Sequence, residues 1–116
     1  MKYTHRISSD QIENIPIIVI EGDMTSDADA DVKKVYSELM DQHNIDKIIV
    51  NFEKTKYINS SGIATLINII QNINDKNGKI AFVGMSDHFK KVMDIVGITD
   101  FVQIFETNNK AADVIR

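Results

Sequence analysis

Cysteine and tryptophan are both absent from this sequence. Without cysteine the chain has no disulfide, no thiolate metal site and no cysteine nucleophile. Only 7% of the residues are aromatic, so few side chains are available to stack against nucleic-acid bases. The net charge is −4, and the basic residues cluster no further than the pairs Lys33-Lys34 and Lys90-Lys91. Because nucleic-acid binding usually needs a concentrated positive face, we expect no nucleic-acid partner.

Long apolar runs are also missing. No run approaches the length of about 20 residues that crosses a bilayer, and the first six residues lack the apolar core of a secretory signal. We therefore expect a cytoplasmic protein without membrane insertion. The 116 residues, 43% apolar and 26% charged, suit one compact globular domain spanning residues 1–116.

Apolar strands alternate with amphipathic helices along the chain. Strands are predicted at residues 17–20, 48–52, 80–83 and 101–105, with a weaker one around Tyr3 to Ser9. Helices are predicted after Gly22-Asp23, from near Ser60 to Asn77-Gly78, from Ser86 to Gly97, and from Asn108 to Arg116. This alternation predicts an α/β fold, a mixed and mostly parallel sheet of about five strands with four helices.

Apolar residues recur at helical spacing in the first three predicted helices. The expected inward positions are Val32, Val35, Tyr36, Leu39 and Met40; Ile63, Leu66, Ile67, Ile70 and Ile73; and Phe89, Val92, Met93 and Val96. In mostly parallel sheets, binding sites usually lie at the carboxyl ends of the strands. The Gly22–Thr25 loop and the Asn59–Gly62 turn follow neighbouring predicted strands, so we expect them to form one surface.

The serine pair Ser60-Ser61 stands where a helix is predicted to begin. The first turn of a helix presents unpaired N–H groups and the positive end of the helix dipole. A serine there is either a cap and nothing more, or a position where a phosphate is well tolerated. Gly62 lacks a side chain, which would let the active site of a partner come close.

Other motifs in the sequence give weaker evidence of function. The acidic run Asp27–Asp31 with Glu38 imitates a calcium-binding loop, but Val32 occupies the position that needs a sharp turn. Acidic residues at a helix N-terminus, with Ser26 and Asp29 resembling a capping box, explain the run better. The three histidines are dispersed and expected to be solvated. With no phosphate-binding glycine loop either, we expect no enzyme, no cofactor and no metal.

The turn Ile58-Asn59-Ser60-Ser61-Gly62-Ile63, followed by an apolar helix, resembles the STAS domain of anti-sigma-factor antagonists. Further similarity lies in the strand Ile48–Phe52, the strand start Gly78-Lys79-Ile80, the helix Ser86–Ile98 and, more weakly, the segment Glu21–Met24. The resemblance covers nearly the whole chain.

The resemblance implies a partner-switching regulator without activity of its own. In that family the usual turn is Asp-Ser-Ser-Gly or Asp-Thr-Ser-Gly, and a partner serine kinase phosphorylates the second hydroxyl residue, which is Ser61 here. The kinase is also the anti-sigma factor, with a histidine-kinase-like ATPase fold, and a PP2C-type serine phosphatase restores the antagonist. This sequence departs at Asn59, where aspartate is commoner.

The expected site therefore consists of the phosphoacceptor Ser61 and a surrounding contact surface. That surface comprises Asn59, Ser60, Gly62, Ile63, Asp23, Met24 and Thr25, with Ser60 expected to be the cap. Two other interpretations stay open. One is a STAS subunit of a constitutive assembly, a stressosome-like scaffold or a lipid-transport complex, and the other is a small enzyme or ligand-binding domain.

Overall fold

The computed structural model describes residues 4–43 and 45–116, except for the side chain of His43. Tyr3, expected at the start of the first strand, lies outside the described residues. The strands are β1 (His5–Ile12), β2 (Ile15–Met24), β3 (Lys47–Asn51), β4 (Thr55–Ile58), β5 (Lys79–Val83) and β6 (Gln103–Phe105). The helices are α1 (Ser26–His43), α2 (Ser60–Asp75), α3 (Asp87–Ile95) and α4 (Asn108–Ile115), with a short 3-10 helix, η1 (Ile98–Asp100).

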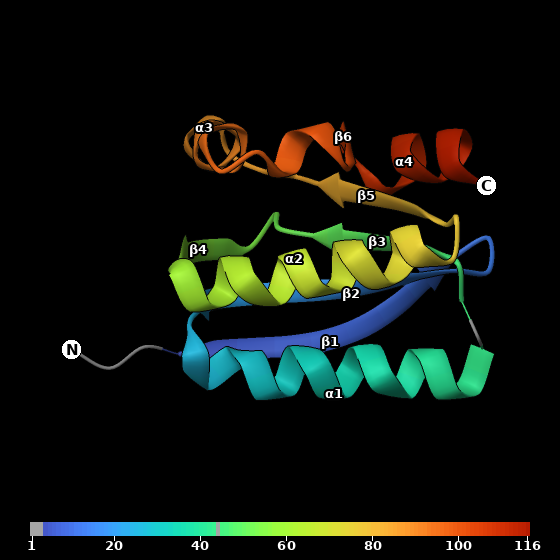
Figure 1. Ribbon diagram of the computed structural model, residues 1–116, viewed down its shortest axis with the longest axis horizontal. Helices are drawn as coiled ribbons and strands as arrows, with labels where there is room; N and C mark the ends of the chain where they lie inside the picture. Colours follow the sequence, from blue (N-terminus) through green and yellow to red (C-terminus); the bar gives the residue numbers. More distant parts are fainter. Residues whose placement is uncertain (1–3, 44) are drawn as a thin grey trace.

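The described strands form one mixed sheet in the order β1-β2-β3-β5-β6 (Figure 1). Only β1 runs antiparallel to its neighbour, and the other pairs are parallel. The expected mostly parallel α/β fold with four helices is confirmed. β4 was not predicted; it pairs in parallel with the end of β2, beyond the point where β3 leaves that strand.

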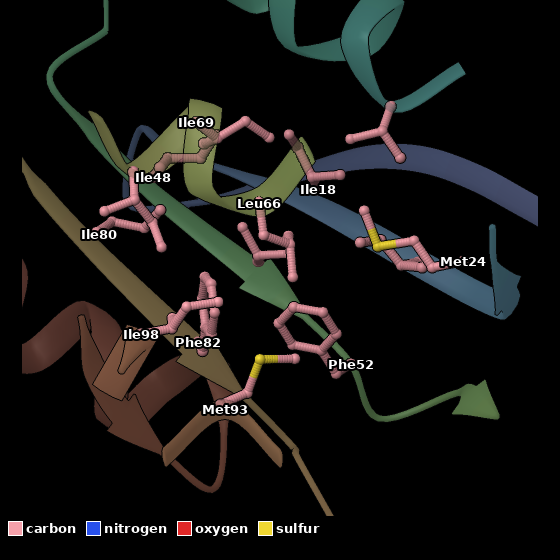
Figure 2. Close-up of a cluster of buried hydrophobic side chains, with 14 of the residues drawn as sticks. Ile18, Met24, Ile48, Phe52, Leu66, Ile69, Ile80, Phe82, Met93 and Ile98 are labelled. Atoms are coloured by element: carbon pink, nitrogen blue, oxygen red, sulfur yellow. The ribbon is translucent and has the colours of Figure 1, made fainter. Parts of the chain in front are cut away.

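The two faces of the sheet are covered by different helices. On one face, alternate residues of the central strands, including Ile18, Ile48 and Phe82, pack against α1, α2 and α3. Figure 2 shows these side chains converging with Phe52, Leu66 and others. The intervening residues face α4, which covers the opposite face through its small and apolar side chains. Because both faces are covered, the strands are continuously apolar, as parallel strands usually are.

Two apolar residues, Ile67 and Val96, depart from the predicted inward positions. Ile67 and Val96 are exposed, and together with Phe101 they line a hollow of about 250 Å³ beside α2 and η1. Phe101 was expected in the last strand, but it follows η1, and its side chain is 62% exposed. Ile69, which the predicted stripe omitted, is buried instead. The buried stripe of α2 is therefore rotated relative to the predicted one.

None of the helices among the described residues is both long and apolar enough to span a membrane.

Candidate functional site

Residues 22–24, predicted to lie in a loop, form the last part of strand β2. Gly22 adopts φ +82°, and the pairing with β4 shifts its register between Gly22 and Asp23. A side chain at Gly22 would lie 2.4 Å from the backbone oxygen of Thr4, so the position requires glycine for both conformation and space. The strand then continues to Met24. The prediction of a Gly22–Thr25 loop is therefore wrong, although β2 does end beside the start of α2 (Figure 1).

Asn59 caps α2. Its backbone is extended, and its side-chain oxygen Oδ1 accepts a hydrogen bond from the Gly62 N–H at 3.0 Å. Its own N–H donates to the Met24 oxygen at 3.2 Å, which ties the start of α2 to the end of β2. The prediction that Ser60 is the cap is wrong, because asparagine is an equally good cap and stands one residue earlier.

Ser60 is the first residue of α2, and it is exposed. Within the described part of the chain, its hydroxyl has no hydrogen-bond partner. The hydroxyl therefore faces solvent at the positive end of the helix dipole.

Ser61 lies deeper than Ser60. Its hydroxyl donates a hydrogen bond of 2.5 Å to Oδ2 of Asp29, in the first turn of α1. The other carboxylate oxygen of Asp29, Oδ1, is buried, and no described residue donates a hydrogen bond to it. The expected capping box of Ser26 and Asp29 is therefore not formed, because Asp29 turns toward α2. The two serines of the pair have different surroundings.

The remaining residues of the predicted contact surface differ in how far their side chains are exposed to solvent. Gly62 is buried, and a Cβ there would lie 2.5 Å from the Met24 oxygen, so this glycine serves internal packing. Met24 is fully buried and Thr25 nearly so, which places both side chains beneath the surface. Ile63 is partly buried and packs against the core. The Asp23 carboxylate accepts from the Thr4 N–H at 3.1 Å.

Acidic side chains lie along the start of α1. Asp27 and Asp29 lie in the first turn of α1, and Asp31 follows in the next. His5 Nε2 lies 2.7 Å from Asp31 Oδ2, so the expectation of a solvated histidine is wrong for His5. His88 is exposed, and the side chain of His43 lies outside the described residues. Among the residues described, no three His, Asp or Glu side chains are placed to hold a metal ion.

Two features of this site were not predicted from the sequence. β4 brings the serine turn to the end of β2, and its only local signal is a short run of strand-forming residues, Thr55 to Ile58. Asp29 and Ser61 are 32 residues apart, and no motif links them.

A family model described as "STAS domain" matches residues 6–111 of the chain. An anti-sigma-B factor antagonist of Staphylococcus aureus (strain NCTC 8325 / PS 47) is 25% identical over 67 residues. That match covers 58% of this chain, and the chain spans 62% of the length of the relative.

Two solved structures share the fold. The Bacillus cell fate determinant SpoIIAA in its phosphorylated form superposes with a TM-score of 0.76 at 20% identity, covering 96% of this chain and 100% of that one. An anti-sigma factor antagonist from Mycobacterium paratuberculosis gives 0.85 at 9% identity, covering 97% and 95%. At these identities the likeness establishes the fold.

Proposed function

The chain belongs to the STAS domain family, and on that basis we propose that it is an anti-sigma-factor antagonist controlled by phosphorylation at the start of α2. In its unphosphorylated form it binds an anti-sigma factor that is also a serine kinase of histidine-kinase-like ATPase fold. Phosphorylation releases that partner, and a PP2C-type phosphatase reverses the modification. The chain itself is a regulatory binding protein and catalyses no reaction.

The observation that carries this proposal is the position of Ser61 in the first turn of α2, where this residue is partly exposed. A phosphate adds about −1.5 to −2 charges at neutral pH. At a helix N-terminus that charge is favourable by about 0.3–2 kcal/mol, so the fold tolerates it. In an interface without a cationic partner, the same charge is desolvated at a cost of several kcal/mol. Partner binding then falls by orders of magnitude while the fold is kept.

We propose Ser61 as the phosphoacceptor, the position that the sequence resemblance indicates. Ser61 lies in the first turn of α2, is partly exposed and donates a hydrogen bond to Asp29, whereas Ser60 is exposed and has no hydrogen-bond partner among the described residues.

The proposed contact surface is smaller than the sequence suggested. It consists of Asn59 and Ser60 with the accessible parts of Ile63 and Asp23, since these side chains are at least partly exposed. Gly62, Met24 and Thr25 support that surface from within. The similarity to the staphylococcal anti-sigma-B factor antagonist supports an anti-sigma factor as the partner class. The phosphorylated state of SpoIIAA supports a switch of this kind.

The first test is intact-mass and peptide mass spectrometry of the protein from its own cells, before and after phosphatase treatment. We expect one removable phosphate, on Ser61. Absence of phosphate in both resting and stressed cells would contradict the switch and favour a STAS subunit of a constitutive assembly.

The second test is binding to the kinase captured by the unphosphorylated chain. Ser61→Asp should weaken binding at least tenfold, because it places a charge in the interface. Ser61→Asn, of the same size without the charge, is the control and should bind within a few-fold of wild type. Equal affinities for Ser61→Asp and Ser61→Asn would contradict the electrostatic mechanism. Calorimetric titration measures both.

A further inference from the structure

One edge of the sheet ends in a long strand that has no neighbour on its outer side among the described residues. This strand is β1, which pairs with β2 alone and stands last in the strand order (Figure 1). Every residue of β1 is at least partly exposed. Alternate residues of an edge strand direct unpaired N–H and C=O groups outward, where another strand can pair with them. β1 has neither a proline nor a break in register that would protect this edge.

The charges of β1 are arranged symmetrically about Ser8. Arg6 and Asp10 stand two residues to either side of it, and because side chains alternate along a strand, all three point to the same face of the sheet. The side chain of Arg6 is 79% exposed and lies 3.9 Å from Glu21 of β2. Asp10 is exposed, lies opposite the uncharged Ile17, and accepts the N–H of the next residue. Both charges of β1 are therefore accessible to a strand that approaches from outside.

Two copies of β1 match these charges when they pair antiparallel about a twofold axis at Ser8. In that register the two serines lie opposite each other, and each Arg6 lies opposite Asp10 of the other copy. Opposite charges at such positions attract and like charges repel. A twofold pair centred on Arg6 or on Asp10 would set like charges against each other. Pairs centred on Ile7 or Ser9 would leave both charges unmatched, so the charge pattern selects one register.

We propose that β1 is the contact strand of a homodimer, in which two copies pair antiparallel and join their sheets into one. Backbone hydrogen bonds supply the attraction, and the two pairs of Arg6 with Asp10 fix the register. The occupant of this edge is a second copy of the chain, because the strand is complementary in charge to itself.

This inference goes beyond the proposed function and does not depend on it. The serine turn lies at the end of β2, beside the start of β1. Because the two copies of β1 run antiparallel, their starts lie far apart. The dimer therefore presents its two serine turns at opposite ends of the joined sheet, and each stays open to a partner.

Charge reversal tests the pairing without removing a buried side chain. Arg6→Glu sets a glutamate against Asp10 of the second copy, and Asp10→Arg sets an arginine against Arg6. Each variant should dimerise more weakly than wild type by roughly tenfold or more. Lys54→Glu is the matched control, because Lys54 is exposed, lies 3.9 Å from the same Glu21 and stands outside β1. It changes the net charge as Arg6→Glu does and should dimerise as wild type does.

A mixture of the two variants gives the sharper measurement. Arg6→Glu and Asp10→Arg carry opposite charges at both matched positions, so together they should form a heterodimer about as tight as the wild-type dimer. A chain with both changes should pair with itself again, since its charges are only exchanged. Sedimentation equilibrium of the full chain at low ionic strength, over a range of concentrations, measures each sample.

Three outcomes would overturn the proposal. They are a wild-type chain that stays monomeric at every concentration, a dimer that Arg6→Glu and Lys54→Glu weaken equally, and a mixture of the two β1 variants that does not associate. The second outcome would place the dimer contact on another surface. None of them bears on phosphorylation of the serine turn, which is measured separately.

Discussion

Asn59 shows how one residue can depart from a family pattern without loss of structure. Its Oδ1 makes the capping bond to Gly62 that an aspartate would also make. The difference is the charge: the aspartate common in the family would add a negative group beside the acceptor. Asparagine keeps the cap and leaves the unphosphorylated turn neutral at that position.

Replacing Asn59 tests the cap directly. Asn59→Ala should lower the free energy of unfolding by about 1 kcal/mol, because the Gly62 N–H loses its partner. Asn59→Asp keeps an acceptor and adds a charge that the helix dipole favours, so its stability should equal or exceed that of wild type. Urea denaturation measures both. An Asn59→Ala chain as stable as wild type would show that the cap contributes nothing.

The sequence predicted some features of the site and not others. The serine pair was located because a local pattern, a strand followed by hydroxyls and an apolar helix, marks a helix start. The hydrogen bond from Ser61 to Asp29 was not predicted, because α1 brings Asp29 to the turn from 32 residues away. Contacts of that kind arise only from tertiary packing, and no local pattern contains them.

At the scale of elements, the helices were predicted better than the strands. Ser86 caps α3, which was predicted to begin there, since a serine before an amphipathic run is a local signal. β4 escaped prediction because it has four residues and becomes a strand by pairing with β2 past the bend at Gly22. Ile67 and Val96 were assigned inward because they stand at the margins of apolar stripes, where spacing alone does not fix burial.

α1 and α2 are joined a second time, away from the serines. The Tyr36 hydroxyl donates to Asn72 Oδ1, and burial raises the pKa of Tyr36 above its ordinary value of 10.0.

The raised pKa of Tyr36 predicts how stability depends on pH. In the unfolded chain the phenol ionises near pH 10, and in the folded chain it ionises only at higher pH. The contribution of Tyr36 is therefore complete below about pH 10 and is lost as pH rises through the folded pKa. Tyr36→Phe should show a shallower fall in stability above pH 10, measured by urea denaturation across that range. An identical fall in both chains would contradict the prediction.

At the scale of the whole molecule, the sheet separates the serine turn from α4. The turn belongs to the face covered by α1, α2 and α3, and α4 packs on the other face. The continuous apolar runs of the strands are typical of a sheet that is covered on both faces. They do not predict which helix covers which face, because that follows from the order and handedness of the connections.

This separation predicts that stability and binding respond independently to changes in α4. Ile115 is fully buried against the sheet, and Ile115→Ala should lower the free energy of unfolding by about 2–5 kcal/mol. Val114, its exposed neighbour, is the control, and Val114→Ala should stay within about 0.5 kcal/mol. Below the melting temperature, both variants should bind the partner as wild type does. Weakened binding by folded Ile115→Ala would show that the two faces are coupled.

The turn between β1 and β2 lies at the opposite end of β2 from the serines. Two residues make it, Glu13 and Asn14, and both adopt positive φ, at 50° and 67°. Hairpin turns of this length favour glycine in the second position, so the chain retains an unfavourable backbone conformation there. The cost falls at the end of β2 opposite the serine turn. A lineage could therefore adapt to heat by substitutions at this turn without altering the proposed contact surface.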